Sequence, residues 1–362
     1  MVRKIGILTH HYISNYGAFL QAYALAEAIE RLFPHDEVWI INYVNMRHFL
    51  INTAGWFRYY RNRETLKMWW EKIKLPLAFS AARKKYLKMT PPCFSAKKIN
   101  EEHFDCIIIG SDEVWNYTDS KANAKIKFGI GLKCGKLISY APSLGKTTPE
   151  DPIPDYVRKG IQSFDSLSAR DGNTKKMVES ITDKKCTMVL DPTFLAEFPA
   201  TKSFEPKEKY ILFYYCEKLP EEIFRKIIDY ANQNNYRIYG AGECDKRYDA
   251  ITVNLSPFEW VEFFRHAEYV FTGTFHGAVF SVLNRKQFGC YLTKPSRIRK
   301  VNDLLDFLAI GDRTLTSEMD VLSKVIDYNA VFKIIDEKKR ISLDYLINSI
   351  GRDETDGKES SL

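Results

Sequence analysis

Residues 269–292 read YVFTGTFHGAVFSVLNRKQFGCYL, and this stretch decides the predicted fold. The apolar run 269–272 leads into a turn flanked by Gly273 and Gly277, a helical pattern at 277–283 follows, and a second apolar run spans 288–292. Two buried strands joined through a helix are expected to be parallel, because parallel strands need a crossover of this kind. Ligands of such sheets bind beyond the carboxyl ends of the strands, so the turn around His276 is a candidate site.

The same alternation of strand and helix covers most of the chain. Further strands are predicted at 4–9, 37–43, 106–109, 137–141, 166–169, 188–190, 210–216 and 237–239. Helical patterns occupy 16–33 and 221–232, and a capping box at Ser256 opens another helix. We therefore predict an α/β fold with two Rossmann-like parallel-sheet domains, 1–200 and 201–350, the second ending in closing helices. They join near 197–209, and the polar tail 351–362 is expected to be disordered.

Composition narrows the class of protein. The chain has 362 residues, of which 45% are hydrophobic and 27% charged, so it can bury two cores. No apolar run reaches the roughly 18 residues that a membrane span needs. The seven cysteines form no CxxC pair and no metal-binding pattern. The N-terminus looks like a core strand rather than a signal peptide, so we expect a cytoplasmic protein without a metal site.

The positive charge is concentrated in the segment 46–94. The whole chain carries a formal charge of +7, and this segment has eleven basic residues against Glu64 and Glu71. It is also rich in Trp and Tyr. Such a helical segment can lie on an anionic membrane surface, here the inner face of the membrane. The alternative is that its aromatic side chains pack in the core and its basic side chains face solvent. Nucleic acid is not an expected partner, because no recognition motif accompanies the charge.

Two loops after predicted strands carry the chemistry expected of an active site. In the first, Thr274, Phe275 and Gly277 surround His276 at a helix N-terminus, where an anion is stabilised and a histidine can exchange protons. The alternative is a histidine that only caps the turn. In the second, Arg170 follows the strand 166–169, and its guanidinium can hold a carboxylate or phosphate through two hydrogen bonds. The alternative is a surface pair with Asp171.

Other candidate binding residues lie in three further loops. After the strand 106–109 come Ser111, Asp112 and Glu113, which either bind substrate hydroxyl groups or cap a helix. The turn with Asn15 and Gly17 resembles a phosphate-binding turn but lacks G-x-G-x-x-G, so no dinucleotide cofactor is expected. A basic loop is either solvated or a second anion site, with the residues Lys294, Arg297, Arg299 and Lys300.

Six motifs in order resemble the polysaccharide pyruvyl transferase family, over about residues 3–315. They are NYGAFLQAYAL (15–25), GSDEVWN (110–116), YAPSLG (140–145), SARD (168–171), LDPT (190–193) and TGTFHGAVFSVLNRKQF (272–288). The resemblance implies two Rossmann-like halves in a GT-B-like arrangement with the active site in the cleft. It also implies transfer of the pyruvyl group of phosphoenolpyruvate onto two sugar hydroxyls as a cyclic ketal, with release of phosphate.

Carried over by motif, the resemblance places the family's histidine at His276 and its arginine at Arg170, with a further basic residue near 294–297. The chain departs from the usual pattern at several positions. Gly273 and Ala18 stand where aspartate is usual, Glu113 replaces glutamine and Lys300 replaces arginine.

The residues and the resemblance together predict a pyruvyl transferase that acts on a surface-polysaccharide precursor. Phosphoenolpyruvate is the expected donor and a sugar, free or lipid-linked, the acceptor; no cofactor is needed. A GT-B-type glycosyltransferase that uses a nucleotide sugar is the first alternative. A non-catalytic binding protein on the same fold is the second, because fold alone does not determine function.

Overall fold

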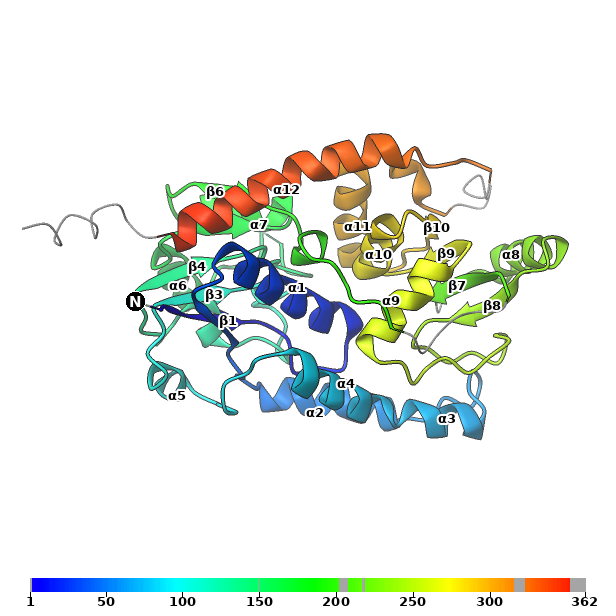
Figure 1. Cartoon of the computed structure of the whole chain (residues 1–362), viewed down its shortest axis with the longest axis horizontal. Helices are drawn as coiled ribbons and strands as arrows, with labels where there is room; N and C mark the ends of the chain where they lie inside the picture. Colours follow the sequence, from blue (N-terminus) through cyan, green and yellow to red (C-terminus); the bar gives the residue numbers. More distant parts are fainter. Residues whose placement is uncertain (1, 149, 202–207, 217–218, 316–322, 352–362) are drawn as a thin grey trace, which may run out of the picture.

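The computed structural model describes residues 2–148, 150–201, 208–216, 219–315 and 323–351. Two α/β halves lie side by side, each built around a parallel sheet (Figure 1). Part of the predicted joining segment, 202–207, and nearly all of the predicted disordered tail, 352–362, lie outside the described residues.

The N-terminal half contains a four-stranded parallel sheet in the order β2-β1-β3-β4. Its strands are β1 (Lys4–Leu8), β2 (Glu37–Ile40), β3 (Cys106–Ile109) and β4 (Lys136–Ser139). A parallel pair, β5 (Leu167–Ala169) and β6 (Cys186–Met188), continues beyond β4, because the Ser139 amide donates to the Ser166 carbonyl at 3.0 Å. β3 is buried along its whole length, as expected for a central strand with cover on both faces.

Helices connect the strands of the N-terminal half, as the predicted alternation of strand and helix requires. The helices outside the basic segment are α1 (Tyr16–Leu32), α5 (Ala96–Asn100), α6 (Asp155–Gln162) and α7 (Gly172–Glu179). The basic aromatic segment, expected to be helical, forms three helices: α2 (Met46–Phe57), α3 (Leu66–Lys72) and α4 (Leu75–Tyr86). Asn45 and Thr65 cap the first two, and Pro76 stands in the first turn of the third.

The C-terminal half repeats the architecture with the strand order β10-β9-β7-β8, all parallel. The strands are β7 (Tyr210–Tyr214), β8 (Arg237–Gly240), β9 (Tyr269–Thr272) and β10 (Gln287–Cys290). The helices are α8 (Glu221–Gln233), α9 (Pro257–His266), α10 (Phe275–Leu283) and α11 (Pro295–Phe307). The predicted capping box is confirmed: Ser256 accepts from the Glu259 amide, and Glu259 accepts from the Ser256 amide.

Two helical segments connect the halves on opposite sides (Figure 1). The long helix α12 (Tyr328–Ile350) begins on the C-terminal half and returns to the first sheet, where Tyr345 donates to the Ser139 carbonyl at 2.8 Å. On the other side, α2–α4 extend under the C-terminal half, and the Lys246 amide donates to the Arg63 carbonyl at 3.0 Å. Within the described residues, none of the helices is long and apolar enough to cross a bilayer.

The core is continuous between the halves beside α1. The Tyr16 ring stacks on Trp260 with 5.1 Å between ring centroids, and its hydroxyl donates to the Leu255 carbonyl at 3.1 Å. Both rings are buried. This packing fixes the start of α1 against the C-terminal half, and the loops after the strands of both halves meet there.

Candidate active site

Asp191 is the residue on which the two halves converge. Its Oδ2 accepts a hydrogen bond from Arg170 Nη1 at 2.6 Å and lies 3.7 Å from His276 Nε2. Arg170 follows β5 in the N-terminal half, and His276 lies in the first turn of α10 in the C-terminal half. The other carboxylate oxygen, Oδ1, accepts from the amide and hydroxyl of Thr193. The predicted meeting of Arg170 and His276 therefore takes place on one fully buried carboxylate.

The charges around Asp191 offset its burial. Burial raises the pKa of Asp191, but the His276 imidazole and the Arg170 guanidinium lower it well below its ordinary value. The pKa of Arg170 is raised, because Asp191 and Asp112 outweigh its burial. The Phe275 ring covers the guanidinium, with Arg170 Cζ 4.5 Å from the ring centroid. Asp191 and Arg170 are thus both charged near neutral pH.

The turn that carries His276 is tightly packed at two glycines, Gly277 within the turn and Gly17 in the first turn of α1. The Thr274 side chain caps α10 by accepting from the Gly277 amide at 3.0 Å. A Cβ at Gly277 would lie 1.9 Å from Thr272 Oγ1, and one at Gly17 would lie 2.1 Å from His276 Nδ1. The first turn of α1 therefore packs directly on the imidazole ring. His276 Nε2 is buried and has no hydrogen-bond partner among the described residues, so it can interact with a bound substrate.

A second acidic group, Asp112, lies on the other side of Arg170. Asp112 Oδ1 is 3.8 Å from Arg170 Nη2, and its Oδ2 is 3.8 Å from His10 Nδ1. Burial raises the pKa of Asp112, but His10 and Arg170 lower it well below its ordinary value. The Lys127 amine contacts His10 Nε2 and donates to the Ala122 carbonyl at 2.6 Å. Burial lowers the pKa of Lys127 to about 7.

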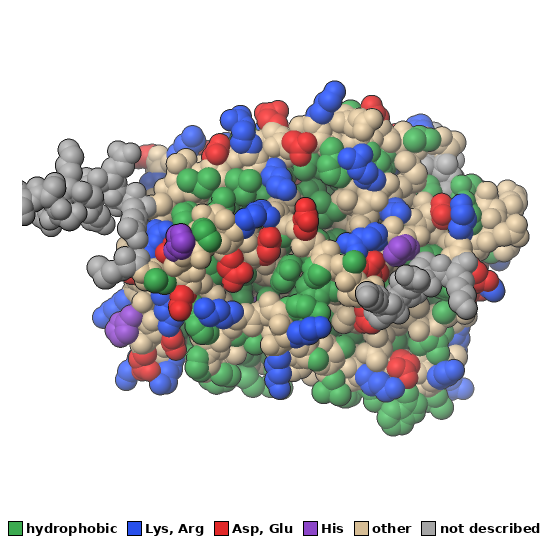
Figure 2. Space-filling model, viewed as in Figure 1, with side chains coloured by type: hydrophobic (Ala, Val, Ile, Leu, Met, Phe, Trp, Pro, Cys, Tyr) green, Lys and Arg blue, Asp and Glu red, His purple; other side chains and the backbone are tan. Residues whose placement is uncertain are grey.

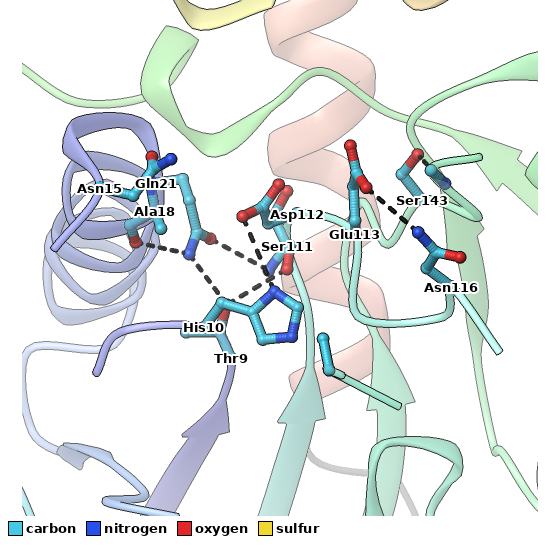
Figure 3. Close-up of polar contacts among 12 residues, drawn as sticks. Thr9, His10, Asn15, Ala18, Gln21, Ser111, Asp112, Glu113, Asn116 and Ser143 are labelled. Atoms are coloured by element: carbon cyan, nitrogen blue, oxygen red, sulfur yellow. Dashed lines mark hydrogen bonds and ion pairs between the residues drawn. The ribbon is translucent and has the colours of Figure 1, made fainter. Parts of the chain in front are cut away.

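Gln21 ties these loops to α1. Its side-chain amide donates to Thr9 Oγ1 at 2.8 Å, and its carbonyl oxygen accepts from the Ser111 amide at 3.2 Å. Figure 3 shows Gln21 extending from α1 between the loops after β1 and β3, with His10 facing Asp112. Ser111 is completely buried and donates to the Ala141 carbonyl, so it holds the loop rather than facing open space.

Two cavities lie near His276, one bordered by Asp191 and the other by Asn15. The first has a volume of about 530 Å³ and is lined by Arg170, Asp191, Phe275 and the cations Lys300 and Lys338. The second has a volume of about 430 Å³ and is lined by Asn15 and by residues of α2, α3 and the loops after β7 and β8. Asp191 lines the first cavity, and its Oδ2 lies 3.7 Å from His276 Nε2. Asn15 lines the second cavity and lies two residues before Gly17, which packs on the imidazole ring.

The expected basic loop is wrong as to structure, because its residues form the N-cap and first turns of α11, and they are only partly directed at the first cavity. Lys300 pairs with Glu113 across the cleft and is mostly buried. Arg297 donates to the Gly273 carbonyl at 3.4 Å, which supports the turn before His276. Lys294 is exposed at the N-cap of α11, and the charge of Arg299 acts on Asp303 and Glu150. Neither lines a cavity described above.

Two departures from the family pattern have a structural reason. A Cβ at Gly273 would lie 2.3 Å from the Tyr215 carbonyl oxygen, so this backbone leaves no room for an aspartate. Ala18 is fully buried against Tyr12 and Ile13, so it does not face the first cavity.

Sequence reasoning missed four polar residues at this site: Asp191, His10, Gln21 and Lys127. Asp191 is part of the LDPT motif, which supported the resemblance but was not assigned a role. His10 directly follows the first strand, so its position at the carboxyl end of β1 was a usable signal. No local signal points to Lys127 or Gln21, which are buried polar side chains on a short helix and on α1. Among the described residues, no group of three His, Cys, Asp or Glu is placed to hold a metal ion.

The fold and the position of the site define a GT-B-like protein with its functional groups between two Rossmann-like halves. A putative UDP-N-acetylglucosamine 2-epimerase from Listeria monocytogenes superposes with a TM-score of 0.53 and 12% identity, covering 100% of this chain and 98% of its own. Another UDP-N-acetylglucosamine 2-epimerase gives a TM-score of 0.54 at 10% identity, with coverage of 98% and 97%. At these identities the likeness concerns the fold alone.

The sequence assigns the family. The model of the polysaccharide pyruvyl transferase family matches residues 15–295, and the chain belongs to this family. A comparison with curated protein sequences finds no significant match.

The contact between Gly17 and His276 predicts a specific coupling. Gly17→Ala is expected to lower the free energy of unfolding by about 1–3 kcal/mol, because the added methyl group overlaps the imidazole. In a His276→Ala background the same change is expected to be neutral or slightly stabilising, since alanine favours a helix more than glycine. Chemical denaturation of the four proteins tests this coupling; an equal loss in both backgrounds would contradict the contact.

Lys127 predicts a pH dependence of stability. Its pKa of about 7 in the folded chain is below the ordinary value of 10.5, so between these values the unfolded chain binds a proton that the folded chain does not. The contribution of Lys127 to stability therefore rises with pH across this window. In Lys127→Met that rise is expected to be missing. Urea unfolding of both proteins from about pH 7 to pH 9 measures the difference, and parallel profiles would refute the assignment.

Proposed function

We propose that this protein transfers the pyruvyl group of phosphoenolpyruvate onto two hydroxyls of a sugar in a surface-polysaccharide precursor, forming a cyclic ketal and releasing phosphate. The observation that carries the proposal is the convergence of Arg170 and His276 on Asp191 at the edge of the first cavity. Membership of the family supports the reaction class. The donor and the ketal product are our inference.

The cations of the first cavity are the groups that would hold a small donor with several negative charges. Phosphoenolpyruvate carries about three negative charges near neutral pH, on a carboxylate and a phosphate. Arg170, Lys300 and Lys338 supply cations to this cavity, beside the carboxylates of Asp171, Asp191, Asp303 and Asp306. The guanidinium presents a planar pair of donors that matches a carboxylate or a phosphate. Arg170 is already oriented by Asp191, so little conformational freedom is lost when the donor binds.

The reaction needs one proton delivered to carbon and two removed from hydroxyls. Protonation of the C3 methylene of phosphoenolpyruvate makes a methyl group and leaves positive charge at C2. One sugar hydroxyl attacks C2, the C2–O bond to phosphate breaks, and the second hydroxyl attacks C2 to close the ketal. Of the two hydroxyl protons, one replaces the proton given to C3 and the other leaves with the phosphate. No oxidant or reductant is required.

His276 is the residue placed to move these protons. Its Nε2 has no hydrogen-bond partner among the described residues, and the Asp191 carboxylate lies 3.7 Å away. A positioned acid or base of this kind contributes about 10²–10⁴-fold to a rate. Arg170 then holds the donor while His276 exchanges protons between C3 and an attacking hydroxyl.

The first test is donor turnover. Purified protein is incubated with phosphoenolpyruvate and either methyl glycosides or a lipid-linked saccharide extract, and phosphate release is measured. His276→Ala is expected to lower the rate by at least about 100-fold. The exposed His35, in the loop after α1, provides the control, and His35→Ala should keep the wild-type rate. An unchanged rate in His276→Ala would refute its catalytic role.

A thermal-shift measurement and the turnover assay together separate the rival functions. A nucleotide-sugar transferase would gain thermal stability from nucleotide sugars and not from phosphoenolpyruvate, since a tight ligand raises stability by mass action. A non-catalytic protein would consume no phosphoenolpyruvate with any acceptor. Either result would overturn the proposed reaction.

We also propose that the basic aromatic segment 46–94 brings the protein to the inner face of an anionic membrane, where a lipid-linked acceptor resides. Ten of the fifteen large hydrophobic side chains that are exposed among the described residues lie in this segment. Leu66 is 64% exposed, Trp70 57% and Leu77 72%. Figure 2 shows apolar and basic side chains together over α3, at the lower right. Such a mixture suits the boundary between headgroups and acyl chains.

Vesicle sedimentation tests the membrane contact. The protein is expected to bind phosphatidylglycerol vesicles and to be released by salt, with weak binding to phosphatidylcholine. Leu66 and Trp70 are four residues apart on α3 and share a face, so Leu66→Ser/Trp70→Ser should weaken binding by at least about tenfold. Ile347→Ser on α12 removes an exposed apolar side chain elsewhere and serves as the control. Equal binding by all three proteins would refute the proposal.

A further inference from the structure

The second cavity is formed where the basic segment meets the C-terminal half. Its walls are the loop before α1, the helix α2, the turn between α2 and α3, and the loops after β7 and β8. Its volume of about 430 Å³ is within the usual range for small-molecule sites. None of the residues considered so far for donor binding or proton transfer, apart from Asn15, lines it.

The lining combines aromatic faces with polar groups. Trp56 and Tyr60 supply the aromatic surface, and Asn15, Asn52 and Glu243 supply hydrogen-bonding groups. Asn52 Oδ1 accepts from the Ser14 amide at 3.0 Å, which ties α2 to the loop that carries Asn15. A few fixed polar groups within an aromatic surface are typical of a site that orients a neutral polar ligand.

The wall beneath Tyr60 is rigid. Lys72 and Glu64 form an ion pair at 2.5 Å between Nζ and Oε1, with both side chains almost fully buried. Glu64 also accepts from the Tyr60 amide at 3.1 Å, and Lys72 Nζ lies 4.9 Å from the centroid of the Tyr60 ring. The backbone and ring of Tyr60 are therefore held before any ligand arrives, which reduces the entropy lost on binding.

The charges argue against an anionic ligand in this cavity. Its two cations are already matched: Lys72 pairs with Glu64, and Arg63 lies 3.8 Å from Asp245. Glu243 adds negative charge, and its carboxylate accepts from the Tyr215 amide and the Tyr248 hydroxyl. The four charged side chains of the lining, Arg63, Lys72, Glu64 and Glu243, sum to zero, so a phosphate or nucleotide diphosphate would meet no excess of positive charge here. A neutral ligand with hydroxyl groups fits better.

We propose that the second cavity binds the acceptor sugar, with a pyranose ring stacked on Trp56 and Tyr60 and its hydroxyls directed at Asn52 and Glu243. This inference rests on the proposed function. A pyranose has one apolar C–H face and a rim of hydroxyls, and the lining matches both. Asn15 lines this cavity and lies two residues before Gly17, which packs on the His276 imidazole. The acceptor would then bind close to the histidine that exchanges protons.

Exposed apolar side chains of the segment 46–94 lie at and beside the second cavity. Ile51 lines the cavity and is 42% exposed, and Phe57, the residue after Trp56, is 52% exposed. A saccharide attached to a membrane lipid can therefore enter the cavity while its lipid stays in the bilayer. This arrangement links the two roles of the segment 46–94.

Binding of methyl glycosides to the full chain tests the inference directly. The probes are the methyl glycosides of glucose, galactose, mannose and their N-acetylated amino sugars, observed by saturation-transfer NMR without phosphoenolpyruvate. At least one is expected to bind, and Trp56→Ala should weaken its binding by at least about tenfold. Trp56→Phe keeps an aromatic face and should retain most of the affinity. The half-buried Trp39 on β2 does not line the cavity, so Trp39→Ala serves as the matched control.

The outcomes separate this inference from the proposed function. Failure of the wild type to bind any of the glycosides, or equal binding by wild type and Trp56→Ala, would overturn the acceptor site. Displacement of a bound glycoside by inorganic phosphate would also overturn it, because it would show an anion site. Failure to bind or consume phosphoenolpyruvate, while Trp56-dependent glycoside binding remains, would instead overturn the donor assignment and leave the sugar site standing. In the turnover assay, Trp56→Ala should raise the KM for the acceptor. The KM for phosphoenolpyruvate should stay within about twofold of the wild-type value.

Discussion

The buried carboxylate of Asp191 is the constraint on which the site depends. A charged group without solvent contact is costly unless it is paired, and losing one partner of such a pair costs about 3–5 kcal/mol. Asp191 has a guanidinium from its own half and an imidazole from the other half within reach of one oxygen. The preference for this pairing fixes the orientation of Arg170 and favours the position of His276 facing it. The closed cleft is therefore partly an electrostatic consequence of one carboxylate.

Close backbone packing makes this arrangement possible. Glycine at 17 and 277 lets α1 approach the imidazole and lets α10 begin tightly after β9. Two helical bridges, α12 on one side and α2–α4 on the other, then hold the halves in register. The second bridge also forms a wall of the second cavity. In this way the segment 46–94 can serve interdomain packing, the proposed acceptor site and the proposed membrane contact together.

Much of the architecture follows from local patterns. Unbroken apolar runs such as 106–109 and 210–214 mark buried strands, and the Ser256 capping box marks a helix start, because these signals depend on neighbours in sequence. The loops that follow strands were correctly expected to carry the polar residues. The role of Asp191 was missed because an aspartate before a proline looks like an ordinary turn residue. Lys127 and Gln21 were missed because burial of a polar side chain depends on distant partners.

By itself, the sequence determined the fold class, the family and the pair of residues, Arg170 and His276, that were expected to meet. The tertiary structure decided which group joins them, which of the basic residues in 294–300 face the cleft, and that one cavity borders Asp191 and another borders Asn15. The reason is physical. Strand and helix signals act over a few residues, whereas the contacts among Arg170, Asp191 and His276 join separate segments that only the folded chain brings together.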